Sequence, residues 1–182
     1  LLTHTSGLIY ESPEMEQRLI DQTPLEDLIE EAYTAPLVFK PGTSLKYADY
    51  NTLIAGKMVE VVTCQPLSEI VKSLVLEPMK LHDTFFPTPE REDARVAIVR
   101  GALGEGTEGA MYNSRYARSL AHPAFAVTAT ARDLVKFASH FAPSGPRIHS
   151  EATVRAMTTN QTGVVTGIHP SMKGYDEQAS VP

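Results

Sequence analysis

Four segments of the chain repeat apolar residues at the spacing of an amphipathic α-helix, whereas only one short run resembles a β-strand. The helical segments are residues 25–33, 48–62, 67–75 and 134–141, and a fifth, shorter one extends from about residue 150 to 160. The strand-like run is residues 95–100 (RVAIVR), which alternates imperfectly. The sequence therefore predicts a mainly helical structure with few strands.

Three of these helices have recognisable start signals. Residues 23–26 (TPLE) combine a capping box with proline at the first helical position. Thr130 is expected to cap the helix over residues 134–141. Asp49 suits the N-cap position of the helix over residues 48–62.

Size and charge exclude several classes of protein. The 182 residues are 42% hydrophobic and 21% charged, which is typical of one globular domain or a large piece of one. The net charge is −6 and there is no basic run, so nucleic acid is not expected as a partner. No apolar stretch approaches the roughly 20 residues of a transmembrane helix. No signal peptide is recognisable either, and the cellular compartment stays undecided.

Neither cysteine nor histidine indicates a metal or redox site. The single cysteine, Cys64, lies among apolar residues and is expected to be a buried, inert thiol. The six histidines are spread singly, without the spacing of metal ligands, and His4 is interpreted as a turn or helix-end residue. HExxH and GxSxG motifs are absent from the sequence. We therefore predict no metal and no cofactor.

Residues 82–129 have the texture of a long loop, rich in proline and glycine. Within them, residues 104–109 (GEGTEG) spell GxGxxG, the fingerprint of a dinucleotide site. Such a site needs a helix that begins at the third glycine, and residues 110–115 show no amphipathic period. Two glutamates in the motif would also repel phosphate. A flexible surface loop is therefore favoured over nucleotide binding.

A candidate site lies in residues 39–56 (FKPGTSLKYADYNTLIAG). Pro41-Gly42 predicts a turn, and an extended segment then leads to Tyr47 just before a helix. The structural interpretation is a packed tyrosine followed by a capping aspartate. The functional interpretation is a phenol at the start of a helix, where a nearby cation would favour its ionised form and make it a base.

Five fragments, in order, resemble the serine β-lactamase family, and most closely its class C, penicillin-binding-protein and EstB-type esterase branch. The fragments are residues 1–8 (LLTHTSGL), Phe39-x-Pro41-Gly42, Tyr47-x-Asp49 with Gly56, residues 76–85 (LEPMKLHDTF) and residues 126–137 (AVTATARDLVKF). The resemblance extends over residues 1 to about 160. It implies the α/β, serine β-lactamase/D-Ala carboxypeptidase-like fold, of which this chain covers mainly the helical part.

Three motifs build the active site in that family. A helix with SxxK supplies the nucleophilic serine and a lysine, a YxN motif supplies a general base, and a strand carries KTG or HxG. The resemblance implies that Tyr47 is the general base and that Asp49 takes the place of the asparagine. Neither SxxK nor KTG or HxG occurs in the sequence. Residues 1–182 are therefore expected to be the helix-rich middle portion of a β-lactamase-like domain, without the nucleophile helix and the C-terminal strand motif.

The resemblance implies a serine hydrolase that cleaves an amide, β-lactam or ester through an acyl-enzyme, with a small-molecule or peptide-like substrate. The chain alone is expected to be inactive, and flanking segments or a partner chain are expected to complete its fold. The alternative is a non-catalytic scaffold or interaction module that has lost the nucleophile. A nucleotide-binding module, built on the loop of residues 104–109, is the weaker alternative.

The aspartate in the YxN position affects the expected substrate. An asparagine amide donates and accepts hydrogen bonds, whereas an ionised carboxylate only accepts. A charged Asp49 would pair with a lysine but repel a carbonyl oxygen, so the parent enzyme is expected to prefer ester or peptide-like substrates over β-lactams. A register in which Asn51 replaces Asp49 in this role stays open, because Asn51 follows Tyr47 by one helical turn.

Overall fold

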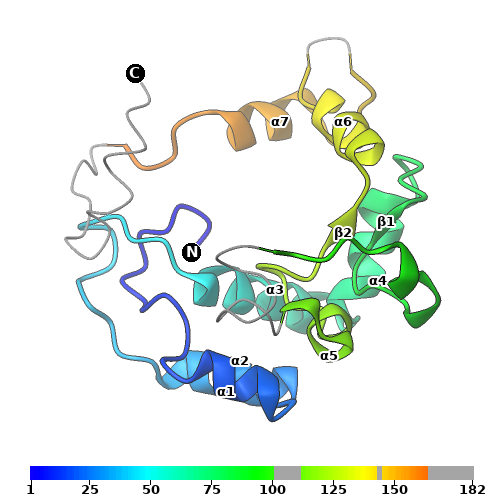
Figure 1. Ribbon diagram of the computed structural model, residues 1–182. Helices are drawn as coiled ribbons and strands as arrows, with labels where there is room; N and C mark the ends of the chain where they lie inside the picture. Colours follow the sequence, from blue (N-terminus) through cyan, green and yellow to red (C-terminus); the bar gives the residue numbers. More distant parts are fainter. Residues whose placement is uncertain (101–111, 143–144, 164–182) are drawn as a thin grey trace.

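The structure is a computed structural model, which describes residues 1–100, 112–142 and 145–163. Figure 1 shows its elements arranged along an open, curved path. The α-helices are α1 (Met15–Ile20), α2 (Leu25–Thr34), α3 (Asp49–Thr63), α4 (Leu67–Val71), α5 (Arg115–Ser119), α6 (Ala131–Ser139) and α7 (Glu151–Thr158). The other elements are a π-helical turn, η1 (Lys72–Leu76), a 3-10 helix, η2 (Glu90–Arg95), and two short strands, β1 (Thr84–Phe85) and β2 (Thr128–Ala129).

The five predicted helices are confirmed. The apolar period is matched best by α2, which packs Leu28, Ile29 and Ala32 into the core, whereas on α6 the apolar residues Leu134 and Phe137 are 55% and 39% exposed. The segment over residues 67–75 forms α4 and continues as η1. Two short helices, α1 and α5, were not expected, because each is too short to show a clear period.

The predicted strand over residues 95–100 is wrong. Residues 90–95 form η2, and residues 96–100 belong to no strand. A side chain takes the place of a strand partner there: the Val99 N–H donates to Asn113 Oδ1 at 2.8 Å, and Asn113 Nδ2 donates to the Val99 carbonyl at 3.0 Å. The β-branched residues of this run therefore reflect an extended segment and not a sheet.

The main core lies between the N-terminal segment and helices α1, α2 and α3. It contains Leu8, Met15, Leu19, Leu28, Ile29, Ala32, Ala48, Tyr50, Leu53 and Leu120. An isolated antiparallel bridge pairs Leu8 of this core with Leu37, which is 53% exposed. Because Tyr50 and Leu53 are both about 1% exposed, the first half of α3 is fixed in position.

The second half of α3 is much more exposed. Met58, Val61 and Val62 belong to the apolar stripe expected on this helix, yet they are 56%, 67% and 83% exposed. Cys64 was expected to be buried, and this is wrong: it is an exposed thiol in the left-handed conformation that ends the helix. The start of α4 contacts α3 at Gly56, where an added Cβ would lie 2.8 Å from Leu67 Cδ2, and at Glu60, whose Oε1 accepts from the Leu67 N–H at 2.9 Å.

Two of the three capping predictions are wrong. Asp49 is the first residue of α3 rather than its N-cap, which is Ala48 and has no side-chain cap. Pro24, not Thr23, occupies the N-cap of α2, again without a side-chain cap. Thr130 does cap α6, since its hydroxyl accepts from the Asp133 N–H at 3.3 Å.

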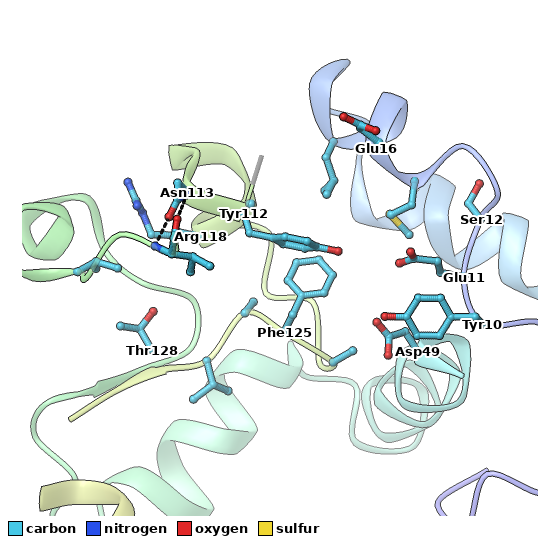
Figure 2. A pocket seen from close by; sticks show the side chains of 18 of the residues that line it. Tyr10, Glu11, Ser12, Glu16, Asp49, Tyr112, Asn113, Arg118, Phe125 and Thr128 are labelled. Atoms are coloured by element: carbon cyan, nitrogen blue, oxygen red, sulfur yellow. Dashed lines mark hydrogen bonds between the residues drawn. The ribbon is translucent and has the colours of Figure 1, made fainter. Parts of the chain in front are cut away.

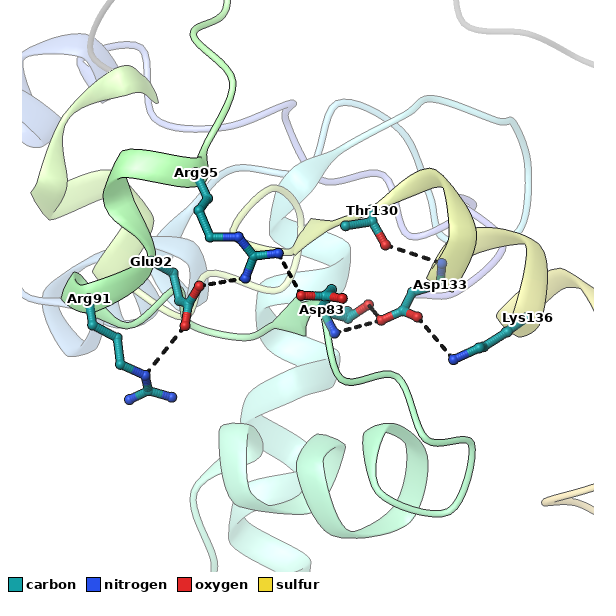
Figure 3. Close-up of polar contacts among 8 residues, drawn as sticks. Asp83, Arg91, Glu92, Arg95, Thr130, Asp133 and Lys136 are labelled. Carbon is teal, nitrogen blue, oxygen red and sulfur yellow. Dashed lines mark hydrogen bonds and ion pairs between the residues drawn. The ribbon is translucent and has the colours of Figure 1, made fainter.

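A buried aspartate links the small sheet to α6 (Figure 3). Strands β1 and β2 pair antiparallel, with Thr84 opposite Ala129. Asp133 is 3% exposed, and its Oδ2 accepts from the Asp83 N–H at 2.8 Å and from the Thr84 hydroxyl at 3.1 Å. Lys136 lies 3.4 Å from the other carboxylate oxygen. One side chain thus fixes the start of α6 against β1.

Candidate functional site

A pocket of about 860 Å³ opens beside the N-terminal end of α3. Its walls come from segments that are far apart in the sequence: residues 10–19, Tyr47 and Asp49, and stretches within 96–99, 112–118 and 124–128. Figure 2 shows Tyr10, Glu11 and Asp49 on one side, facing Tyr112 and Phe125 on the other. The pocket therefore combines carboxylates with aromatic rings.

Tyr47 lies at this pocket and is 42% exposed. Its ring is flanked by two others, with centroids 4.6 Å away for His4 and 5.7 Å away for Tyr10. The backbone on either side is also held, because the Lys46 N–H donates to the His4 carbonyl at 3.0 Å. The phenol is therefore accessible but fixed in position, immediately before α3.

A buried polar network positions the start of α3. Asn51 is 0% exposed; its Oδ1 accepts from the Ser6 hydroxyl at 2.6 Å, and its Nδ2 lies 3.0 Å from His4 Nδ1. The Ala48 N–H donates to the same His4 nitrogen at 3.3 Å. His4 is thus a residue of the turn that also holds the helix. The amide of Asn51 is fully engaged by these partners.

Asp49 is 6% exposed and lines the pocket beside Tyr47. Its backbone N–H donates to the Tyr10 carbonyl at 2.7 Å. Burial raises the pKa of the Asp49 carboxyl, and hydrogen bonding to Tyr47 and the charge of His4 offset this only in part. Its Oδ1 is buried and has no hydrogen-bond partner among the described residues. This oxygen is able to accept from a group that is not among them.

Glu11 is a second carboxylate in the same pocket, and the sequence analysis missed it. Burial, followed by the charge of Asp49, raises the pKa of Glu11 to about 7. Its Oε2 is also buried without a hydrogen-bond partner among the described residues. No sequence signal marks Glu11, because it follows the turn in an irregular segment. Only the folded chain brings it near Asp49.

The two carboxylates affect the phenols around them. Burial, followed by the charges of Glu11 and Asp49, raises the pKa of Tyr112 to about 12. Burial and the charge of Asp49 raise the pKa of Tyr10 as well. Both phenols therefore stay protonated near neutral pH and are able to donate hydrogen bonds into the pocket.

The described residues contain no group of three or more histidine, cysteine, aspartate or glutamate side chains placed to bind a metal ion. In the same part of the chain, no helix is both long and apolar enough to cross a membrane. The glycine-rich motif of residues 104–109 lies outside the described residues. The chemical groups that the pocket offers to a ligand are therefore mainly carboxylates, phenols and aromatic rings.

The fold is that of the serine β-lactamases. The structure superimposes on a putative β-lactamase from Bacteroides dorei DSM 17855 with a TM-score of 0.62 and 21% sequence identity, over 93% of this chain and 44% of that one. The sequence matches the Beta-lactamase family over residues 1–179. The chain belongs to this family, and it covers mainly the helical part of the fold.

Characterised relatives lie in the esterase and penicillin-binding-protein branch of the family. The chain is 34% identical to lovastatin esterase from Penicillium rubens over 121 residues. The aligned region is 60% of this chain and 30% of the esterase. It is 32% identical to penicillin-binding protein 4 from Amycolatopsis lactamdurans over 129 residues. The aligned region is 68% of this chain and 34% of that protein. The chain thus spans about a third of the length of these relatives.

Proposed function

We propose that the chain is the middle portion of a longer serine hydrolase, in which Tyr47 acts as general base and Asp49 positions a lysine. The observation that carries this proposal is the placement of the Tyr47 phenol, which is exposed in a pocket, fixed between two rings and adjacent to a buried carboxylate. Membership of the Beta-lactamase family supports the reaction class. The nucleophilic serine and its lysine would come from a flanking helix with SxxK.

In this proposal the reaction proceeds in two steps through a serine ester. Tyr47, as its phenolate, takes the proton of the serine hydroxyl while the serine oxygen attacks the substrate carbonyl. The bond to the leaving group then breaks, and Tyr47 returns the proton to that group. Water next attacks the acyl-enzyme while Tyr47 accepts its proton. The serine ester bond then breaks, and Tyr47 returns the proton to the serine oxygen, which restores the phenolate. A cation beside the phenol, such as the lysine of the flanking helix, would favour its ionised form.

Asp49 has the properties required of a partner for a lysine. Its Oδ1 is buried and has no partner among the described residues, so an ammonium group would gain a charge-assisted hydrogen bond there. That ammonium would also lower the pKa of Asp49, which burial alone raises. Asp49 would therefore be ionised in the complete enzyme and would only accept hydrogen bonds.

The substrate class that we propose is an ester or a peptide-like amide. An ionised Asp49 next to the substrate carbonyl is less suited to a β-lactam than an asparagine that donates to it. A lovastatin esterase among the relatives agrees with ester substrates. Replacing Asp49 by Asn in the longer enzyme should therefore raise β-lactam turnover relative to ester turnover, and an unchanged ratio would contradict this substrate preference.

A Tyr47→Phe variant of the longer enzyme tests the role of the phenol. Loss of a general base typically lowers kcat by about 10²- to 10⁴-fold, and we expect that range here. Tyr33→Phe is the matched control, because Tyr33 is 52% exposed on α2 and does not line the pocket. A Tyr47→Phe variant with the kcat of the control would exclude Tyr47 as the base.

A further inference from the structure

Two histidines that are nine positions apart in the sequence face each other at the C-terminal end of α6. His140 follows the last residue of α6 and is 1% exposed, whereas His149 precedes the Ser150 cap of α7 and is exposed. Nε2 of His140 lies 3.1 Å from Nδ1 of His149. The two residues lie on either side of the connection between α6 and α7, so only the fold brings them together (Figure 1). Neither lines the pocket beside α3.

The backbone around His140 determines which nitrogen of its ring carries the proton. The Pro146 carbonyl lies 2.9 Å from His140 Nδ1, and a carbonyl oxygen only accepts hydrogen bonds. The Ile148 N–H approaches the same nitrogen at the longer distance of 3.3 Å. The shorter contact places the proton of the neutral ring on Nδ1, so Nε2 keeps a lone pair on the side of His149. Without a metal ion, this lone pair accepts the His149 N–H.

The same arrangement is typical of histidines that bind metal ions. A metal-binding histidine almost always donates its other ring N–H to a carbonyl, a carboxylate or water, which fixes the ring. Two imidazole nitrogens at about 2.0–2.1 Å from one ion, at square-planar to tetrahedral angles, are roughly 2.8–3.4 Å apart. The separation of 3.1 Å between His140 and His149 lies within this range. His140 is held by the backbone, and the exposed His149 is able to turn its ring toward an ion.

The donor atoms select the kind of ion. Imidazole nitrogens suit Zn²⁺, Ni²⁺ and Cu²⁺, whereas Mg²⁺ and Ca²⁺ require oxygen ligands. Among the described residues no third histidine, cysteine or carboxylate completes a group with this pair, so water would fill the other positions. Arg147 donates to the His140 carbonyl and places a positive charge on the same loop. Both features limit the affinity, and Cu²⁺ should bind most tightly of the three ions.

We propose that His140 and His149 form a binding site for one divalent transition-metal ion, which takes Cu²⁺ in preference to Zn²⁺ and Ni²⁺. The ion would join the C-terminal end of α6 to the start of α7. Because the two nitrogens meet only in the folded chain, the bound ion would stabilise the connection between these helices. This inference does not depend on the hydrolase function.

Calorimetric titration of the metal-free natural protein at pH 7.5 with Zn²⁺, with Mg²⁺ and with Cu²⁺ added as its glycine complex tests the site. We expect Cu²⁺ and Zn²⁺ to bind and Mg²⁺ to give no measurable binding. His149→Gln should weaken the binding of Cu²⁺ and Zn²⁺ at least tenfold. His82→Gln is the matched control, because it removes an exposed histidine from the turn before β1, and it should bind as the original protein does.

Equal affinities of the original protein and His149→Gln would overturn the proposal. A loss in His82→Gln as large as that in His149→Gln would overturn it too, because the ion would then bind without this site. Thermal unfolding in the absence of metal shows whether each variant is folded.

Labelling of the unchanged protein with diethyl pyrocarbonate, which modifies accessible imidazoles, gives an answer that needs no variant. Saturating Zn²⁺ should lower the labelling of His149 at least fivefold and leave that of the exposed His82 unchanged. Protection of neither histidine, or of both equally, would contradict the site.

Discussion

The side-chain amide of Asn51 lies 3.0 Å from Nδ1 of His4, which joins two segments 47 residues apart in the sequence. Asn51 is on the first turn of α3, and His4 belongs to the turn that begins the described chain. The ring of Tyr47 packs against that of His4, with centroids 4.6 Å apart. The Asn51 amide therefore helps to hold His4, and through His4 the ring of Tyr47, in position.

Replacing Asn51 by Ala should lower the free energy of unfolding by about 1–3 kcal/mol, because it removes the acceptor of the Ser6 hydroxyl and one of the two groups that contact His4 Nδ1. Chemical denaturation measures this loss. Asn160→Ala is the control, since Asn160 is exposed and, among the described residues, its side chain accepts hydrogen bonds from nearby Thr162. Equal losses in the two variants would show that the network around Asn51 contributes little.

Asp133→Ala should detach the start of α6 from β1. The variant loses hydrogen bonds from the Asp83 N–H and the Thr84 hydroxyl to a buried carboxylate, and we expect it to be less stable by about 2–3 kcal/mol. Asp27→Ala, on the exposed face of the first turn of α2, should cost less than about 1 kcal/mol. Denaturation midpoints that do not separate these two variants would contradict the role of Asp133.

His122 should make the protein sensitive to acid. It is 0% exposed, and burial lowers its pKa from 6.5 to about 4, so the unfolded chain binds the proton more readily than the folded chain. Stability should therefore be complete above pH 6.5 and fall by about 3 kcal/mol as the pH drops to 4. His122→Phe should remove this drop, whereas His82→Phe, at an exposed position, should keep it. The test is the free energy of unfolding of the three proteins between pH 4 and 7.

Glu11 should have the opposite pH dependence. Its pKa rises from 4.5 to about 7 on folding, so the folded chain holds the proton more tightly between these values. Stability from this group is present at pH 4.5 and lost as the pH rises through 7. Glu11→Gln should therefore stabilise the chain at pH 8 more than at pH 4.5, as measured by thermal unfolding. A gain that is the same at both pH values would show that Glu11 is not desolvated.

The sequence predicted the helices well, because their signal is local. The apolar period of α2 places Leu28, Ile29 and Ala32 in the core without knowledge of what they contact. The wrong expectations concerned features that depend on tertiary contacts. Residues 95–100 could form a strand only beside a second strand, and the Val99 N–H instead donates to the Asn113 side chain. Cys64 could be buried only if another element packed over it, and it is exposed.

The candidate site was predictable only where a motif marked it. The resemblance indicated Tyr47 and Asp49, and they lie together in the pocket. Glu11 and Tyr112 are about 100 residues apart in the sequence, and no period or spacing connects them. The tertiary fold brings them to one pocket, and the burial that raises the pKa of Glu11 to about 7 arises only there.

The most direct test of the central proposal is the intact mass of the natural protein before and after reaction with a fluorophosphonate, which labels activated serines. A serine hydrolase in which residues 1–182 are the middle portion should have a mass greater than that of these 182 residues, and it should gain one probe adduct. A protein with the mass of the 182 residues alone and no adduct would contradict the proposal. It would favour the non-catalytic scaffold, in which Tyr47 has no nucleophile to serve.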